Sequence, residues 1–403
     1  MAKTVRKKQK SVADRLRIFA PQIDGFRTWL HNNGYRPVTC VELVRLLACW
    51  ADWIRAAGFT LDTVLAGLDA SAAVFKGSRA NRAPYGAAAL FIRYLQDKGI
   101  LSPPPKPPSP AETWPILAAF RHWMRSERGL LDTTLGTYQS SLVDFIKSLG
   151  DDPSAYDARA VRAFVLAQAA PNNRRRAQLI AVATRAFLRF LIATDQCPVG
   201  LDHAIPKFAN WQLASIPCHL ETTDIDRVIA ACNGDERLRD KAIILLLARL
   251  GLRASEVSNL TFGQIDWQHG RFTVAGKSRR EERLPLTQEI GDAMIAYIER
   301  TRPRVPTPQL FLTEVAPIGP LTRITVKCIV RRALDRAGID SAHRGAHVLR
   351  HSAATAMLQH GVSLAGVGAV LRHRSPGMTA HYAKVDIALL SEIAQPWIGR
   401  LPC

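Results

Sequence analysis

The 403-residue sequence lacks any apolar run that approaches the length of about 18 residues typical of a membrane-spanning helix. Its longest run, Ala242 to Ala248, suits a buried helix segment instead. The first ten residues, MAKTVRKKQK, are basic but lack the apolar region of a secretory signal. These absences predict a cytoplasmic protein that makes no use of a membrane.

Cysteine is scarce and scattered. The seven cysteines include no CxxC pair and no Cys/His cluster with the spacing of a metal site. Their odd number and wide separation predict reduced, structural thiols, and we expect no metal site. They are Cys40, Cys49, Cys197, Cys218, Cys232, Cys328 and Cys403.

Acidic residues are few relative to basic ones. Asp and Glu number 34 against 54 Lys and Arg, which gives a formal net charge of +20 and a pI near 10.2. Such an excess predicts an anionic partner of high charge density, DNA or RNA first. Ribosomal or membrane-surface binding usually shows a basic tail or a basic amphipathic helix. Here the excess is spread along the chain, which favours nucleic acid.

The length and the prolines predict several domains. Hydrophobic residues make up 47% of the chain, and 403 residues exceed what one core usually supports. The segment SPPPKPPSP, residues 102–110, is the clearest linker because consecutive prolines favour an extended backbone. A second linker with Pro206 and Pro217 covers residues 206–220. The predicted domains are an additional N-terminal helical domain (1–101), a middle helical domain (111–205) and a C-terminal domain (221–403).

The two helical domains share a sequence pattern. Both carry apolar residues at helical spacing in segments that end at glycine or a polar turn. Phe26 to Leu30 matches Phe120 to Met124, and LFIRYL (Leu90 to Leu95) matches AFLRFL (Ala186 to Leu191). Either the N-terminal domain is a duplicate of the middle domain, or two amphipathic helical domains converged on similar apolar patterns.

The C-terminal domain mixes helices with a few strands. Helical patterns include Asp240 to Leu250 and Thr325 to Ala337. Three short strand candidates, QIDW (264–267), RFTVAG (271–276) and ERLPL (282–286), are joined by a turn-forming QHG and a polar loop. We therefore expect the fold class to be mainly α with a small antiparallel β-sheet.

Four motifs carry residues suited to chemistry. LARLGLRASEVSNL places Arg253 just after a helix-ending glycine, with Glu256 three residues on and close enough to orient the guanidinium. Alone, each motif also has an ordinary interpretation as a helix cap, a surface charge, a loop residue or a core aromatic. The other three are GAHVLRHSAAT with His347 and Arg350, LRHRS with His373, and TAHYAKV with Tyr382.

Together with Lys277, in the loop after the second strand, these residues resemble the active site of the tyrosine recombinase (phage integrase) family in order and spacing. The resemblance covers the chain from about Trp114 onward. It implies a SAM-like helical core-binding domain before a mixed α+β catalytic domain, with double-stranded DNA as the partner. The implied catalytic residues are Arg253, Lys277, His347, Arg350, His373 and the nucleophile Tyr382, supported by Glu256.

The chemistry of a phosphodiester suits this set. Negative charge grows on the nonbridging oxygens during attack, and the two bidentate guanidiniums of Arg253 and Arg350 can hold them. A tyrosine has an ordinary pKa near 10, so Tyr382 needs nearby cations or a base, for which His347 is our candidate. The departing 5′ oxygen needs a general acid, for which we choose Lys277. His373 would donate to a phosphate oxygen.

The resemblance also implies a 3′-phosphotyrosine intermediate, reversed by a 5′ hydroxyl of another strand, without metal, ATP or another cofactor. It implies a homo-oligomer, a tetramer on two DNA sites, with other recombinases of the same element as further partners. The long N-terminal extension favours a mobile-element integrase or transposase over a chromosome-dimer resolvase. A type IB topoisomerase-like enzyme and a catalytically silent DNA-binding protein are the alternatives.

Some basic residues keep two interpretations each. Arg372 stands where family members often have glycine, and it could clash with a tight turn or add a DNA phosphate contact. Arg279 and Arg280 share the loop of Lys277 and are DNA-binding candidates, and an arginine there could contact phosphate without serving as the acid. Further DNA-binding candidates, in the middle domain, are Arg174, Arg175 and Arg176.

Overall fold

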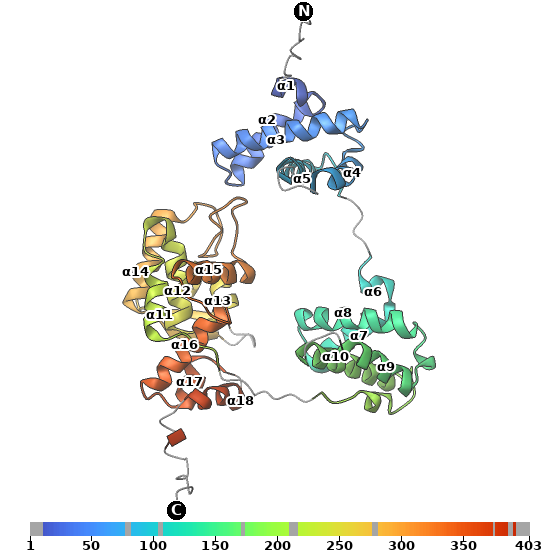
Figure 1. Cartoon of the computed structure of the whole chain (residues 1–403), viewed down its shortest axis with the longest axis vertical. Coiled ribbons are helices and arrows are strands. Elements are labelled where there is room, and N and C mark those ends of the chain that lie inside the picture. Colours follow the sequence, from blue (N-terminus) through green and yellow to red (C-terminus); the bar gives the residue numbers. More distant parts are fainter. Residues whose placement is uncertain are drawn as a thin grey trace, which may run out of the picture. The chain divides into compact units, whose positions relative to one another are not determined.

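The computed structural model describes residues 11–76, 82–103, 108–170, 174–208, 217–275, 281–373, 375–385 and 390–391 (Figure 1). These residues form helices and one small antiparallel sheet, which confirms the expected fold class. Among them, no helix has both the length and the apolar character needed to cross a bilayer. The chain divides into two compact units, one from Pro103 to Gln212 and the other from Met1 to Ser102 together with Leu213 to Cys403. The further separation of residues 1–101 from 221–403 stays a prediction.

The unit from Pro103 to Gln212 is a set of helices around one aromatic core. Phe120 packs edge-on against Phe187 with ring centroids 5.4 Å apart, and Phe145 packs edge-on against both Phe164 and Phe187. These rings recur at helical spacing, so each helix presents one apolar face to the core. The helices are α6 (Pro110–Thr113), α7 (Pro115–Arg128), α8 (Asp132–Leu149), α9 (Ala158–Ala169) and α10 (Arg174–Ala193).

Residues 11–102 form a second set of helices with a core of its own. Pro37 lies in the first turn of α3, where a missing N–H is tolerated. Trp50 is fully buried, and its indole Nε1 donates to Ser71 Oγ at 3.0 Å. The main helices are α1 (Val12–Arg15), α2 (Ala20–Asn32), α3 (Pro37–Ala56), α4 (Val64–Lys76) and α5 (Arg82–Asp97).

The aromatic packing of these two helical sets is alike. In residues 11–102, Phe26 packs edge-on against Phe91 at 5.2 Å, as Phe120 packs against Phe187 in the middle domain. Three residues further along each helix, Trp29 contacts Tyr94 in the N-terminal set, and Trp123 contacts Phe190 in the middle domain. Equivalent rings at equivalent sequence positions favour duplication over convergence. The duplicate stays a prediction.

The segment after residue 217 combines helices with a three-stranded sheet of order β1-β2-β3, antiparallel throughout. Phe272 pairs with Ile265 on one side and with Leu284 on the other, and these three side chains are buried. The strands are β1 (Ile265–Asp266), β2 (Arg271–Ala275) and β3 (Glu281–Pro285), within a residue or two of the expected ranges. The helices are α11 (Thr222–Ala230), α12 (Leu238–Arg249), α13 (Ala254–Asn259), α14 (Gln288–Ala296), α15 (Arg323–Arg336), α16 (Ala346–Gln359), α17 (Leu364–Val370) and α18 (Pro376–Ala380).

Helix α12 is the centre of this segment. Every residue from Ala242 to Ala248 is buried, and the helix contacts α11, α14, α15 and α16. A helix that is apolar on all sides is stable only when other elements surround it. The longest apolar run of the sequence is therefore a core helix, and its end at Arg249 leads directly to Arg253.

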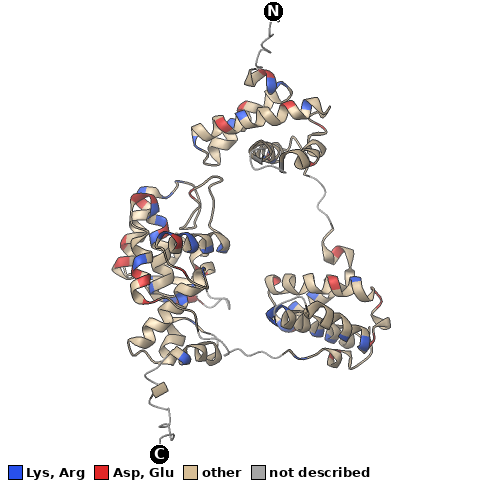
Figure 2. Ribbon diagram, in the orientation of Figure 1, with Lys and Arg blue, Asp and Glu red and all other residues tan. Residues whose placement is uncertain are grey.

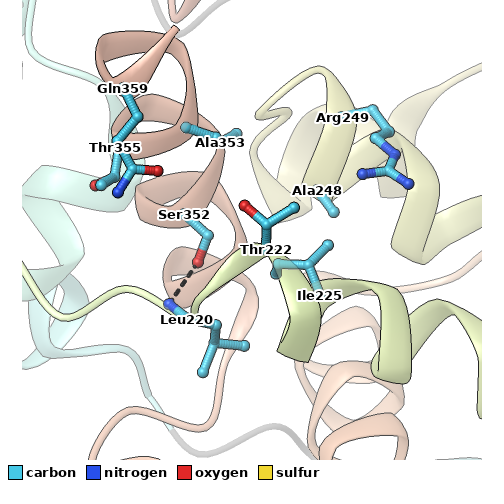
Figure 3. A pocket seen from close by; sticks show the side chains of 10 residues that line it. Leu220, Thr222, Ile225, Ala248, Arg249, Ser352, Ala353, Thr355 and Gln359 are labelled. Atoms are coloured by element: carbon cyan, nitrogen blue, oxygen red, sulfur yellow. Dashed lines mark hydrogen bonds between the residues drawn. The ribbon is translucent and has the colours of Figure 1, made fainter.

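Helix α16 uses two faces. On one face, Ser352 Oγ accepts the backbone N–H of Leu220 at 2.8 Å, which fixes the start of this segment to the helix (Figure 3). Beside that contact lies a small pocket of about 40 Å³ that Thr355 and Gln359 also line. Helical periodicity places His347 and Arg350 on a different face from these residues. That second face carries the candidate site.

We expect Gly251→Ala to destabilise this segment more than an alanine at another left-handed glycine. Gly251 has φ 59°, and a Cβ there would lie 2.5 Å from Cδ2 of Leu371, which is fully buried. The backbone conformation alone should cost about 1 kcal/mol, and the steric overlap a further 1–3 kcal/mol, roughly.

The matched control is Gly361→Ala. Gly361 has φ 79°, and a Cβ there would meet nothing within 4 Å, so only the backbone penalty applies. Urea unfolding of both variants measures the difference in the free energy of unfolding. Equal losses for the two variants would contradict the close approach of Gly251 to Leu371.

Candidate active site

Arg253 is held by Glu256 at the start of α13. The backbone N–H of Arg253 donates to Glu256 Oε2 at 2.8 Å, and Arg253 Nη1 donates to Glu256 Oε1 at 2.7 Å. The carboxylate thus closes the first turn of the helix and orients the guanidinium at the same time. This is the contact that the three-residue spacing predicts. The Arg253 side chain is 24% exposed, so it can also meet a ligand.

Arg350 is a buried guanidinium on α16. Its Nη1 donates to the carbonyl of Gly251 and its Nη2 to the carbonyl of Leu371. Burial lowers the pKa of Arg350 to about 10, and the positive charges of Arg253 and Arg372 lower it further, yet the side chain stays charged at neutral pH. Because both acceptors are neutral carbonyls, these two contacts do not neutralise the positive charge. Such a charge is suited to an anionic ligand.

The turn after α17 brings both guanidiniums together. The carbonyl of Leu371 accepts from Arg350, and the carbonyl of Arg372 accepts from Arg253 Nη2 at 3.1 Å. His373 follows directly, and its backbone N–H donates to the carbonyl of Gly368 at 2.9 Å. In this turn, residues 371 and 372 bind two candidate side chains, and residue 373 is a candidate itself.

Arg372 follows neither of the two interpretations given to it from the sequence. Its backbone has φ 58°, the left-handed conformation that glycine adopts most easily, so the turn forms with an arginine in this position. Its side chain is only 2% exposed and pairs with Glu256 at 2.8 Å, so in this position it is not a surface phosphate contact. The glycine expected here is replaced by a buried cation.

Tyr382 lies against this cluster with its hydroxyl engaged. It is 3% exposed, packs on an apolar group that includes Val367 and Leu371, and its Oη lies 2.7 Å from Nδ1 of His351. The ring of His373 stacks on it, with centroids 6.0 Å apart and planes within 7°. Burial raises the pKa of Tyr382, while the positive charge of Arg350 acts in the opposite direction.

His351 is the residue that the sequence analysis missed. It directly follows Arg350 and lies one helical turn after His347, whose exposed ring has its centroid 6.2 Å from that of His351. That four-residue spacing was the available signal, because residues four apart share a helix face. The hydrogen bond to Tyr382 is made by His351, and the basic role given to His347 stays a prediction.

Two of the histidines that contact Tyr382, His351 and His373, have strongly lowered pKa values. Burial lowers the pKa of His351 to about 4, and the neighbouring His347 and His381 add to the effect. Burial also lowers the pKa of His373 to about 4, and the charges of Arg350 and Arg253 add to it. His373 Nδ1 lies 2.8 Å from Thr379 Oγ1. Both rings are therefore neutral at pH 7 and can accept a proton or a hydrogen bond.

We expect stability to fall as the pH falls through this window. Between pH 6.5 and about 4, the unfolded chain binds protons at His351 and His373 that the folded protein does not bind, so unfolding becomes easier as the pH decreases. Above pH 6.5 the rings are neutral in both states, and their contribution is constant. The slope should be on the order of 1 kcal/mol per pH unit for each histidine. His351→Asn should flatten it between pH 6.5 and 5, as measured by urea unfolding; an unchanged slope would contradict the lowered pKa.

The remaining candidates lie either outside the described residues or in the unit from Pro103 to Gln212. Lys277, Arg279 and Arg280 lie outside the described residues, between β2 and β3. Arg174, Arg175 and Arg176 begin α10 in the other unit, where the first two are exposed and the third is half-buried. Lys and Arg are mixed with Asp and Glu over many helices (Figure 2). Within the described ranges, no group of three His, Cys, Asp or Glu residues could hold a metal ion.

Known proteins match both the sequence and the fold. The model of the phage integrase family matches residues 219–388. A Sinorhizobium fredii protein named as an integrase/recombinase (y4rA) is 35% identical and aligns over 93% of each chain. Tyrosine recombinase XerD of Shewanella oneidensis is 29% identical over 70% of this chain and 95% of its own length.

Two solved structures share the fold. XerH site-specific recombinase bound to its palindromic difH substrate has a TM-score of 0.56 at 20% identity, covering 70% of this chain and 84% of that one. The Tn1549 transposon integrase in complex with transposon right end DNA has a TM-score of 0.53 at 14% identity, covering 68% and 99%. Because y4rA is 35% identical to this chain over 93% of each sequence, and the family model matches residues 219–388, the chain belongs to the phage integrase family of tyrosine recombinases.

Proposed function

We propose that the chain is a site-specific DNA recombinase that cuts and rejoins strands through a covalent bond between Tyr382 and a 3′ phosphate. The observation that carries this proposal is the cluster itself. Arg253 and Arg350 meet at the turn of residues 371–373, and Tyr382 packs beside it against His373 and His351. Two cations next to one phenol suit attack on a phosphodiester.

In the proposed reaction the Tyr382 oxygen attacks phosphorus while the guanidiniums of Arg253 and Arg350 bind the nonbridging oxygens. The bond from phosphorus to the 5′ oxygen breaks, and that oxygen takes a proton from Lys277. The phenolic proton passes to His351, and His347 extends the path towards solvent. A bound phosphodiester adds negative charge, which raises the pKa of both buried histidines and makes them better bases. A 5′ hydroxyl of another strand then reverses each step.

Double-stranded DNA is the proposed partner. The XerH and Tn1549 structures are complexes with DNA, and both share the fold of this chain. We place duplex binding on the middle domain (111–205) and the catalytic domain (221–403), with Arg174, Arg175 and Arg176 as phosphate contacts. We further propose a tetramer on two DNA sites and a role in moving a genetic element, in line with the integrase/recombinase name of the relative y4rA.

A nicked-duplex assay tests this function. Duplexes tiled across the DNA that flanks the coding region carry a nick one nucleotide after each candidate position, so that the short 5′-hydroxyl fragment diffuses away after cleavage. We expect a protein–DNA adduct that survives denaturing electrophoresis. Exchange of label between two duplexes supports a recombinase, whereas relaxation of a supercoiled circle without exchange supports a topoisomerase. If the protein binds the duplexes but forms an adduct with none of them, the result supports a catalytically silent DNA-binding protein instead.

A further inference from the structure

A third guanidinium lies beside the two that the proposed chemistry uses. Arg372 Nη2 donates to Glu256 Oε2 at 2.8 Å, and Nη1 donates to the carbonyl of Val370 at 2.9 Å. The side chains of Arg372 and Glu256 are 2% and 3% exposed. Because this ion pair is buried, it cannot contact a ligand in solvent directly, and it can influence the site only through the residues that it contacts.

Those contacts form a closed ring with Arg253. The Arg372 side chain binds one oxygen of Glu256, the other oxygen binds Arg253 Nη1, and Arg253 Nη2 returns to the Arg372 carbonyl at 3.1 Å. Arg372 therefore fixes Arg253 twice, directly through its backbone and indirectly through its side chain. In a closed ring, the loss of one contact loosens the others.

The backbone of Arg372 is strained in this arrangement. Its φ of 58° is a left-handed conformation that a residue with a Cβ adopts less readily than glycine does. Strain of this kind persists where the surroundings compensate it. Here the same conformation aims the carbonyls of Leu371 and Arg372 at Arg350 and Arg253.

The charges give the ring a second consequence. Burial would raise the pKa of Glu256, but hydrogen bonds from Arg253 and the charge of Arg372 hold it below its usual range, so the carboxylate is ionised. One negative charge is shared by two guanidiniums. Without Arg372, Glu256 Oε2 would keep only the Arg253 backbone N–H, and the whole carboxylate charge would pair with Arg253, where Glu256 would compete with a phosphate for that guanidinium.

We propose that Arg372 is a positioning residue: it holds Glu256 away from full pairing with Arg253 and thereby keeps the Arg253 guanidinium oriented and its charge only partly compensated, so that it can bind an anionic phosphate. The proposal deepens the proposed strand-transfer function and rests on it for its activity readout. It assigns to this chain a role for the position where the family often has glycine.

The test compares Arg372→Gly with Arg372→Lys in the full chain, using single-turnover cleavage of the nicked duplex. The glycine variant relieves the backbone strain, so we expect it to fold, to bind the duplex as wild type does, and to cleave roughly 10- to 100-fold more slowly. The lysine variant keeps the charge but has a single nitrogen in place of the planar fork that binds both Glu256 and the Val370 carbonyl, so its rate should lie between those of glycine and wild type. If glycine impairs folding, the lysine variant alone decides, and an unchanged cleavage rate would overturn the proposal.

A double-mutant cycle with Glu256→Gln isolates the coupling. If Arg372 acts through Glu256, Arg372→Gly should slow cleavage less than about threefold once Glu256 is already glutamine. An undiminished effect in that background would overturn the proposal. The matched control is Glu282→Gln, because the Glu282 carboxylate is 4.0 Å from Arg372 Nε and half-exposed; it should leave the cleavage rate unchanged.

A readout without DNA separates this proposal from the proposed function. Carbon-13 NMR of the Glu256 carboxyl, assigned with the Glu256→Gln variant, should show a higher pKa in Arg372→Gly than in wild type. If wild type forms no covalent adduct but that pKa rises, the strand-transfer function fails and the ring of contacts stands. If wild type forms the adduct but Arg372→Gly changes neither rate nor pKa, the positioning role fails alone.

Discussion

Tyr382→Phe should abolish the covalent adduct while leaving the protein folded and bound to DNA. The substitution removes only the hydroxyl, which is the proposed nucleophile, and phenylalanine keeps the packing of the ring on Val367 and Leu371. The lost hydrogen bond to His351 should lower the free energy of unfolding by about 1 kcal/mol. Adduct formation on the nicked duplex, measured beside duplex binding and urea unfolding, separates lost chemistry from lost structure.

Tyr297→Phe is the matched control for that result. Tyr297 is also fully buried in this segment, and its hydroxyl accepts the backbone N–H of Leu312 at 3.2 Å. It contacts none of the candidate catalytic groups described above. We expect a similar loss of stability and an intact adduct. Wild-type amounts of adduct in Tyr382→Phe would show that another group attacks the phosphate.

Arg253→Lys should slow cleavage by roughly 10²- to 10³-fold, the second large effect that the site predicts. Lysine keeps the charge but lacks the planar fork, so it cannot bind Glu256 and the Arg372 carbonyl at once and still present a donor to phosphate. The partly exposed side chain makes a folding defect small. Single-turnover cleavage at saturating protein concentration measures the loss in the chemical step.

Arg249→Lys is its control, four residues earlier in the chain. Arg249 pairs with Asp226 and Glu289 beside the small pocket of Figure 3, away from the candidate site. Exposed pairs of this kind contribute little, so its cleavage rate should stay within about fivefold of wild type. Similar losses in both variants would point to general electrostatics instead of a built phosphate site.

The sequence predicted the fold where local patterns decide it. Prolines and glycines mark the ends of several helices, and the three strands lie within a residue or two of the expected ranges. The contact of Glu256 with Arg253 followed from a spacing of three residues at a helix start. Periodicity also indicated why Ala242 to Ala248 is buried on all sides.

Other parts of the site depend on contacts that no local pattern specifies. His351 and Tyr382 are 31 residues apart, and their hydrogen bond exists only because residues His381–Val385 pack against α16. The pairing of Arg372 with Glu256 spans 116 residues. The left-handed turn at Arg372 could not be predicted from a glycine, because none is present there. Its strain is compensated by the contact with the Glu256 carboxylate.

The most direct test of the central claim is the chemical identity of the linkage. Adduct trapped on a nicked duplex can be treated with nuclease and trypsin, and the nucleotide-bearing peptide identified by mass spectrometry. The account predicts a nucleotide on the peptide from Ser375 to Lys384, in which Tyr382 is the only tyrosine. A nucleotide on any other residue, or a noncovalent complex in every fraction, would contradict it.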